Sequence, residues 1–345
     1  MIKCFDIHGI LKCRFEWEKY GAFTEDLDQK INYFQVDKVY NPDIDVRVGD
    51  FNPDLDGCRI CDEGIYVKDN FIFCKGANPK VKWVIQVNGL IDRRTIVNVK
   101  TKLISLRGFL APNLLMWSLL IPLLELKFFE RGYMLLHSAA VSREGNAYLL
   151  SGRGGAFKTS VVMDLVRSYG YEYMSDERSL VTFGRVLSFP THIRIFEFCL
   201  NNLKGENMNV IAKLRLLYNL IKSQQPEIKV KNEGELSGLL FLNPSTKEFK
   251  VESLDSELAA RKMLSNQVME SFEALKIVNI DVSPLFKCFN AYSAACPHSS
   301  LANFERRLFS KLKRVLSDIP IYNVYIPLEY SKDVAEFIAK LLQRL

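Results

Sequence analysis

A glycine-rich segment between an apolar stretch and an amphipathic one limits the folds open to this chain more than any other feature. It reads GRGGAFKTS over residues 152–160, and the apolar stretch 147–150 before it has the length of a strand. Val161, Val162 and Leu165 follow at helical spacing. A glycine-rich turn from a strand into a helix aims backbone N–H groups and the helix dipole at one point, which favours an anion. We therefore expect an α/β arrangement with an anion site at this turn.

The segment matches the P-loop pattern G-x-x-x-x-G-K-[ST] at every position except the second glycine, where the chain has Phe157. Lys158 can reach the β- and γ-phosphates of a nucleoside triphosphate, and the Thr159 hydroxyl can coordinate Mg²⁺. Phe157 argues the other way, because a glycine there adopts backbone angles that are costly for an aromatic residue. A turn that merely joins a strand to a helix is the alternative, but the context favours phosphate binding. The residues expected to contact the nucleotide are Gly152, Arg153, Gly154, Gly155, Ala156, Phe157, Lys158, Thr159 and Ser160.

An acidic pair, Asp176 and Glu177, follows the next expected strand, residues 171–174. In a parallel strand–helix–strand unit both strands end at the same edge of the sheet, which is where ligands bind. The pair should therefore lie beside the glycine-rich loop. Carboxylates there can hold Mg²⁺ or accept the proton of an attacking hydroxyl. The residues expected to bind the metal are thus Thr159, Asp176 and Glu177.

Three stretches of the chain together resemble the HPr kinase/phosphorylase family, which shares its P-loop fold with phosphoenolpyruvate carboxykinase. They read HSAAV over 137–141, NAYLLSGRGGAFKTS over 146–160 and YMSDERSLV over 173–181. LSFPTHIRIFEF over 187–198 is similar to a segment that commonly follows the acidic pair in relatives. The resemblance covers residues 120–198 and implies a phosphoenolpyruvate carboxykinase/HPr kinase-like P-loop domain.

The resemblance also implies a role for each matched position. His137 corresponds to an active-site histidine near the phosphates, and Lys158 and Thr159 correspond to the phosphate- and metal-binding groups. Asp176 corresponds to the carboxylate that acts as general base, and Glu177 to a metal-binding carboxylate. These roles fit phosphoryl transfer, which depends on positioning and on neutralising charge. For His137 taken alone, a core histidine outside any site is the alternative.

Together these residues predict an ATP-dependent kinase with Mg²⁺ as its metal. The γ-phosphoryl group would pass to a hydroxyl, with Asp176, His137 and Lys158 as the catalytic residues. The acceptor stays open between a serine of a protein or peptide and a small alcohol. A nucleotide-binding sensor or scaffold with little or no turnover is the alternative function, and Phe157 is the residue that favours it.

The rest of the chain predicts a second, β-rich domain before the P-loop domain. Turn signals at His8-Gly9, Lys68-Asp69-Asn70 and Asn88-Gly89 separate short stretches of strand-forming residues. Residues 113–131 read as an apolar helix that stops at Gly132. We expect an α/β protein, α+β overall, with an N-terminal β-rich domain over 1–108 and the P-loop domain over 109–345. Further strands are expected at 135–141, 179–183, 186–189, 239–242, 249–251 and 321–326, and further helices at 158–168, 207–222, 304–316 and from Ser331 to Leu342.

Composition and charge narrow the function classes. Apolar residues make up 48% of the chain and charged residues 25%, as in ordinary folded proteins, and the net charge of +6 permits a nucleotide but does not favour nucleic acid. The start of the chain has no signal-peptide pattern, so we expect a cytoplasmic protein and leave a homo-oligomer open. The most apolar region, 109–129, is too interrupted to span a membrane. The interrupting residues are Pro112, Asn113, Pro122, Glu125 and Lys127.

Cys58 and Cys61 form a C-x-x-C pair, which is how many zinc sites begin. The other interpretation is that the cysteines are buried free thiols in a reducing compartment. A four-ligand zinc site would need two further ligands at spacings that fit no standard pattern. The residues available for it are Cys4, Cys13, Cys74 and His8.

Two weaker candidates lie outside the main motifs. His192 and Arg194 follow Pro190, and an arginine there could reach a transferring phosphate, although a surface arginine without a role is the alternative. The helix expected at 304–316 carries a basic face that a solvated surface explains. That face comprises Arg306, Arg307, Lys311, Lys313 and Arg314.

Overall fold

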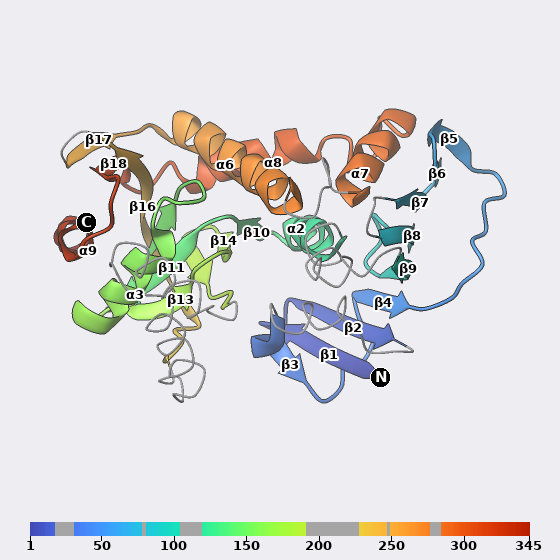
Figure 1. The fold of residues 1–345 in the computed structure, drawn as a ribbon, viewed down its shortest axis with the longest axis horizontal. Helices are drawn as coiled ribbons and strands as arrows, with labels where there is room; N and C mark the ends of the chain where they lie inside the picture. The colour runs from blue at the N-terminus through green and yellow to red at the C-terminus, as the bar shows by residue number, and fades with distance from the viewer. Residues whose placement is uncertain (18–30, 78–80, 104–118, 191–227, 247–248, 277–283) are drawn as a thin grey trace, which may run out of the picture. The chain divides into compact units, whose positions relative to one another are not determined.

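The computed structural model describes residues 1–17, 31–77, 81–103, 119–190, 228–246, 249–276 and 284–345. Over these residues the chain is a mixed α/β protein that divides into two compact units (Figure 1). Unit 1 comprises Met1–Leu135 and Ala260–Arg314, and unit 2 comprises Leu136–Ala259 and Val315–Leu345. The mixed class expected from the sequence is confirmed. None of the helices in the described residues is long and apolar enough to cross a membrane.

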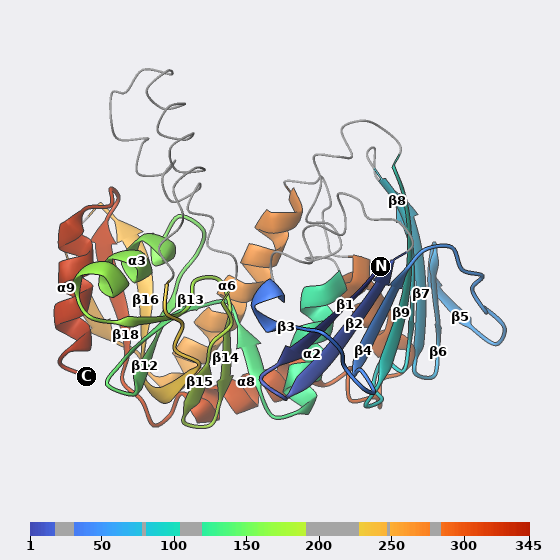
Figure 2. The same ribbon diagram turned by 90° about the horizontal axis from the view of Figure 1, so that it is seen from below.

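Unit 1 is built on a sheet with the strand order β3-β1-β2-β4-β9-β8-β7-β6-β5 (Figure 2). β2, β4 and β9 pair in parallel, and the other neighbours pair antiparallel. The three expected turns are confirmed, since Gly9, Asn70 and Gly89 have positive φ. The strands are β1 (Ile2–Ile7), β2 (Leu11–Trp17), β3 (Gln35–Val36), β4 (Ile44–Val48), β5 (Arg59–Asp62), β6 (Ile65–Lys68), β7 (Phe71–Ala77), β8 (Val81–Asn88) and β9 (Thr95–Leu103), and the 3₁₀ helix η1 (Asn32–Phe34) precedes β3.

Helix α2 (Ile121–Glu130) confirms the apolar helix expected before Gly132, which has a φ of +90°. Pro122 lies in the first turn of this helix. Residues 113–118 of the expected helix lie outside the described residues. Helix α8 (Phe304–Val315) is also confirmed, and its apolar side is buried. Two further helices, α6 (Ser256–Lys276) and α7 (Pro284–Ala295), were not expected from the sequence.

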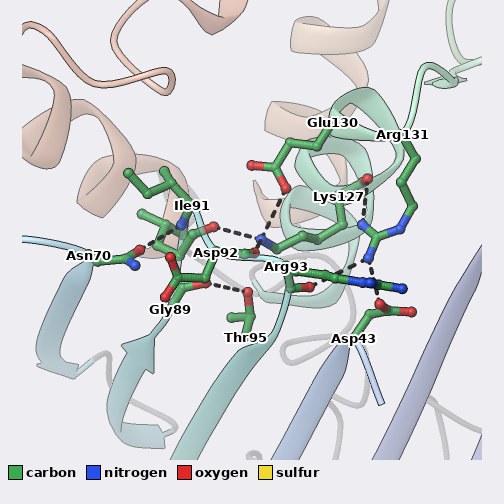
Figure 3. Close-up of polar contacts among 11 residues, drawn as sticks. Asp43, Asn70, Gly89, Ile91, Asp92, Arg93, Thr95, Lys127, Glu130 and Arg131 are labelled. Carbon is green, nitrogen blue, oxygen red and sulfur yellow. Dashed lines mark hydrogen bonds and ion pairs between the residues drawn. The ribbon is translucent and has the colours of Figure 1, made fainter. Parts of the chain in front are cut away.

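A buried lysine joins α2 to the sheet of unit 1 (Figure 3). The Lys127 ammonium is fully buried and donates to the carbonyls of Leu90 at 2.9 Å and Asp92 at 2.6 Å, and to Glu130 Oε2 at 3.1 Å. Burial lowers the pKa of Lys127, and the Glu130 carboxylate acts against that shift. One turn later, Arg131 donates to Asp43 Oδ1 at 2.6 Å. α2 is therefore held against the β8–β9 turn by charge-assisted hydrogen bonds as well as by apolar packing.

The compact units do not divide the chain at residue 108. α2 belongs to unit 1 through the contacts of Lys127, and Ala260–Arg314 adds α7 and α8 to the same unit. α7 contacts β5, β6 and β7, and Tyr292 on α7 accepts a hydrogen bond from the Asn70 N–H at 3.2 Å. Each unit is thus assembled from two separate stretches of the chain. Composition along the sequence cannot reveal that arrangement, because it follows from long-range packing.

Unit 2 contains a sheet in which β14, β15, β16, β12, β11 and β13 are neighbours in that order, while β18 pairs with β16 and β17 pairs with β18. β12, β16 and β18 are parallel, and helices α3 and α9 pack with them in one hydrophobic core. The helix expected at 158–168 is confirmed, and Ser331 precedes the last helix as expected. The elements are β11 (Ala139–Arg143), β12 (Asn146–Ser151), α3 (Lys158–Ser168), β13 (Glu172–Ser175), β14 (Ser179–Thr182), β15 (Arg185–Leu187), β16 (Glu233–Ser245), β17 (Lys250–Ser253), β18 (Ile321–Pro327) and α9 (Lys332–Leu342), and β10 (Met134–Leu136) lies where the two units divide.

Two expectations for this part of the chain are wrong. The single strand expected at 135–141 is broken at His137 and Ser138, where the Ser138 N–H bonds back to the Leu136 carbonyl at 2.9 Å. The strand expected to end at Leu242 instead continues to Ser245 as β16, because Asn243 to Ser245 pair in parallel with β18. The helix expected at 207–222 lies outside the described residues, as do His192 and Arg194.

Candidate functional site

The register of three strands brings the predicted site residues to one edge of the sheet in unit 2. On β11, Ala139 pairs with Leu150 of β12, and the next residue, Ala140, pairs with Ser175 of β13. β11 runs antiparallel to both neighbours, so the carboxyl ends of β12 and β13 flank its amino end. That edge therefore carries the glycine-rich loop, the segment before β11 and the acidic pair. The sequence predicted this proximity but not the intervening strand.

Gly152 is required by close packing at the start of the loop. A Cβ atom there would lie 2.7 Å from the Leu242 carbonyl oxygen at the end of β16 and 2.9 Å from Ala156 Cβ. Contacts that short are not tolerated, so a side chain at this position would displace the loop. Gly155 has a φ of +82°, the left-handed conformation that glycine adopts without strain. Gly152 is the first glycine of the pattern, whereas Gly155 occupies a position for which the pattern specifies no residue.

Phe157 adopts the backbone conformation that the P-loop pattern assigns to glycine. Its φ and ψ are 59° and 19°, in the left-handed region, and it is the residue just before α3. Its half-buried ring packs against Tyr330, with ring centroids 5.6 Å apart and an interplanar angle of 46°. The prediction that an aromatic residue would be strained here is confirmed by these angles. The contact with Tyr330 shows what helps to hold the residue in place.

Lys158 begins α3 and folds back over the loop. Its ammonium donates to the Gly152 carbonyl at 2.6 Å and to the Arg153 carbonyl at 3.3 Å. The charge therefore lies over the backbone of the glycine-rich segment, at the positive end of α3. Thr159 is half-buried in the first turn of this helix, and Arg153 is exposed. This arrangement concentrates positive charge where an anion would meet the loop.

His137 lies at the break between β10 and β11 and is 2% exposed. Burial lowers its pKa well below the usual value of 6.5, and the nearby charges of Lys158 and Arg178 lower the pKa further. The imidazole is therefore neutral at pH 7. A neutral imidazole can donate one hydrogen bond and accept another, but it adds no charge to the site. The interpretation of His137 as a member of the site agrees with its interaction with Lys158.

The acidic pair is half-buried at the end of β13. The Tyr173 hydroxyl donates to Asp176 Oδ1 at 3.0 Å, which orients that carboxylate. Burial raises the pKa of Tyr173 well above its usual range, and Asp176 and Glu177 raise it further. Tyr173 therefore remains a proton donor to Asp176 at neutral pH. Tyr173 was not among the site residues expected from the sequence, although a tyrosine hydroxyl two residues before the end of a buried strand is a signal that could have pointed to it.

Sequence reasoning also missed Arg178. This arginine directly follows the acidic pair and is 1% exposed, and its charge acts on His137. A buried guanidinium is rare unless it serves other polar groups. Its position between the acidic pair and the strand expected at 179–183 is the signal that could have pointed to it, since the first three residues of β14 are buried.

Buried serines connect the three segments of the site. Ser175 and Ser179 share a hydrogen bond of 2.7 Å, and Ser179 Oγ donates to the Ser138 carbonyl at 3.0 Å. Ser151 Oγ lies 3.5 Å from the His137 carbonyl, at the limit of a hydrogen bond. These contacts link the end of β13, the start of β14 and the break before β11. The break is thus fixed by hydrogen bonds to its neighbours.

The described residues contain no group of three or more His, Cys, Asp or Glu side chains that could hold a metal ion. The expected magnesium ligands, Thr159, Asp176 and Glu177, supply a hydroxyl and two carboxylates. Such a sparse set suits Mg²⁺, which keeps several waters and takes further oxygens from substrate phosphates. Cys58 is half-buried and Cys61 is exposed, both as free thiols, whereas Cys4, Cys13 and Cys74 are buried.

The chain matches no protein-family model and none of the curated proteins. The chemistry of the site is therefore inferred from its own residues and their contacts.

Proposed function

We propose that the chain is an ATP-dependent kinase that transfers the γ-phosphoryl group to a hydroxyl, with a fold of the phosphoenolpyruvate carboxykinase/HPr kinase type. The observation that supports it best is the convergence of Lys158, His137 and Asp176 at one edge of the unit 2 sheet, given by the register of β11 with β12 and β13. A lysine over a glycine-rich loop and a carboxylate beside it are the two groups that phosphoryl transfer needs most.

In this proposal each residue acts through its position. The phosphates bind to the backbone N–H groups of the loop and to the N-terminus of α3. The Lys158 ammonium leaves the carbonyls of the loop and donates to the phosphate oxygens instead. Thr159 and Glu177 would hold Mg²⁺, which would neutralise phosphate charge during the transfer. Asp176 takes the proton of the acceptor hydroxyl. The hydroxyl oxygen of the acceptor then bonds to the γ-phosphorus, and the bond between the γ-phosphorus and the oxygen that bridges it to the β-phosphate breaks, so that ADP leaves. His137, being neutral, donates a hydrogen bond to phosphate oxygen.

A sensor or scaffold that binds a nucleotide with little turnover is the second candidate. The left-handed backbone of Phe157 favours it, because an aromatic residue at this position limits how the loop can rearrange around phosphates. Both candidate functions require nucleotide binding, but only the kinase transfers a phosphoryl group. A single experiment that measures both binding and transfer therefore separates them.

The test combines calorimetric binding of MgATP with ADP release in the presence of protein, peptide and small-alcohol acceptors. Lys158→Ala should weaken MgATP binding at least about tenfold, through loss of a charge-assisted contact. Asp176→Asn should leave binding within about twofold and slow transfer by about 10²-fold or more, as expected for loss of a general base. Lys340→Ala, which removes an exposed lysine of α9, is the matched control and should change neither.

Wild-type protein that binds no MgATP at millimolar concentration would overturn both candidates. Binding without ADP release for any acceptor would favour the sensor. Full transfer by Asp176→Asn would remove Asp176 from the catalytic residues while leaving the phosphate site intact.

A further inference from the structure

We propose that Phe157 and Tyr330 form a stacking platform for the base of the bound nucleotide, so that the site selects nucleoside triphosphates over bare polyphosphates. This inference rests on the proposed function and adds to it the part of the ligand that the rings recognise. Phe157 directly precedes Lys158, and its ring packs against Tyr330 at 5.6 Å between centroids. A partly exposed aromatic pair therefore adjoins the loop that would hold the phosphates.

The topology puts Tyr330 on the correct edge of the sheet. Tyr330 follows β18, which is parallel to β16, and β16 is parallel to β12. The segments that follow β12 and β18 therefore leave the sheet at the same edge, and in α/β sheets ligands bind beyond the carboxyl ends of the strands. Phe157, at the end of the glycine-rich loop, and Tyr330, before α9, are far apart in sequence and meet there through their rings.

The strained backbone of Phe157 indicates that its side chain has a use. A left-handed conformation is costly for a residue with a Cβ, and glycine would avoid this cost. Strain of this kind persists where the surroundings enforce it, and it clusters at ligand-binding sites. Stacking of a nucleic-acid base on an aromatic ring is favourable and can offset such strain when a nucleotide is bound.

The ring of Tyr330 is fixed by a hydrogen bond from its hydroxyl group. Its hydroxyl donates to Asp164 Oδ2 on α3 at 2.7 Å, and burial followed by this carboxylate raises its pKa far above neutral pH. The phenol is therefore protonated and anchored to the same helix whose N-terminus faces the loop. A ring that is already fixed loses little conformational entropy when a base stacks on the platform.

A purely structural role for the aromatic pair is the competing explanation. Phe157 and Tyr330 both pack against the core shared by α3, α9 and the parallel strands. In that case removing either ring would lower stability and would affect all ligands of the loop equally. The platform instead requires that the two rings increase the affinity only for ligands that carry a base.

The test compares dissociation constants of MgATP and magnesium tripolyphosphate, measured by calorimetry on the full chain. Wild type should bind MgATP at least about tenfold more tightly than tripolyphosphate, which corresponds to about 1.4 kcal/mol. Phe157→Gly should remove most of that advantage and leave the tripolyphosphate affinity within about twofold, since glycine accepts the backbone angles. Tyr330→Leu should act in the same direction. Phe249→Leu is the control, because it breaks another aromatic pair of unit 2, with Phe337 at 4.6 Å, and should change neither constant.

Equal affinities of wild type for the two ligands would overturn the platform, as would equal losses for both ligands in Phe157→Gly and Tyr330→Leu. In either case tripolyphosphate still binds, so the phosphate site of the proposed function survives. Wild type that binds neither ligand would overturn the proposed function and the platform together. Thermal unfolding of each variant identifies any loss that comes from the fold itself.

Discussion

The imidazole of His137 is buried beside two cationic side chains, and this arrangement has a consequence for stability. Burial, Lys158 and Arg178 all lower its pKa, so the folded chain leaves it unprotonated under conditions where an unfolded histidine, with a pKa near 6.5, takes up a proton. The contribution of the neutral imidazole to stability is therefore fully present above pH 6.5 and decreases as the pH falls. The decrease is at most about 1.4 kcal/mol per pH unit for one proton.

We expect this linkage to show in urea unfolding between pH 5 and 8. The difference in unfolding free energy between wild type and His137→Gln should be constant above about pH 7 and should shrink below pH 6.5, because only the wild type has this histidine to protonate on unfolding. His298→Gln, at an exposed histidine, should give a curve parallel to that of wild type. A difference between wild type and His137→Gln that does not change with pH would contradict the linkage.

For a single residue, the sequence can predict the backbone conformation that its position needs, but not the side chains that surround it. The P-loop pattern predicted an unusual backbone at Phe157, and the residue has that backbone. Its contact with Tyr330 could not be predicted, because the two residues meet only through the parallel packing of β12, β16 and β18. The burial of Arg178 was missed for a related reason, since a charged residue between two strands, here β13 and β14, is usually exposed unless other parts of the fold cover it.

Helix α2 carries a buried lysine, Lys127, whose ammonium donates to the β8–β9 turn and to Glu130. We expect Lys127→Met to lower the free energy of unfolding by about 2–4 kcal/mol, since it leaves the Leu90 and Asp92 carbonyls without their donor and removes the partner of Glu130. Urea denaturation measures this loss. Lys100→Met is the matched control, because Lys100 and its partner Asp50 are exposed, and it should cost less than about 1 kcal/mol. Similar losses in the two variants would show that the buried contacts of Lys127 add nothing.

Elements whose ends carry local signals could be predicted, and those defined by packing could not. α3 has the predicted bounds because the glycine-rich loop begins it and Gly170, with a φ of +73°, follows its end. The break at His137 and Ser138 lies within a continuous apolar stretch and is fixed by hydrogen bonds to distant serines. α6 was missed because small and polar residues, among them Ala259, Ala260 and Gln267, form part of its buried face and hide the helical period.

For the whole molecule, the path of the chain matters more than the order of its motifs. It passes between the two compact units after Leu135, Ala259 and Arg314, so neither unit is a continuous segment. The domain boundary drawn at residue 108 followed a change from strand-like to helical sequence, which is a local property. The return of Ala260–Arg314 to unit 1 depends on the packing of α7 against β5, β6 and β7. The hydrogen bond between Asn70 and Tyr292, which joins residues 222 positions apart, belongs to this packing.

A fragment of residues 1–135 should therefore fail to fold cooperatively, although it contains the whole sheet of unit 1. Without α7 it loses the buried side chains of Leu285, Cys288 and Tyr292, and β7 loses the cover that they provide. Burial of three such side chains contributes about 1.5–3 kcal/mol each, a large part of the stability of a typical domain. Circular dichroism during heating and hydrogen exchange of β7 amides would measure the effect, with the full chain as reference. A sharp transition in the fragment, with β7 amides protected as in the full chain, would mean that the sheet of unit 1 needs none of the helices contributed by Ala260–Arg314.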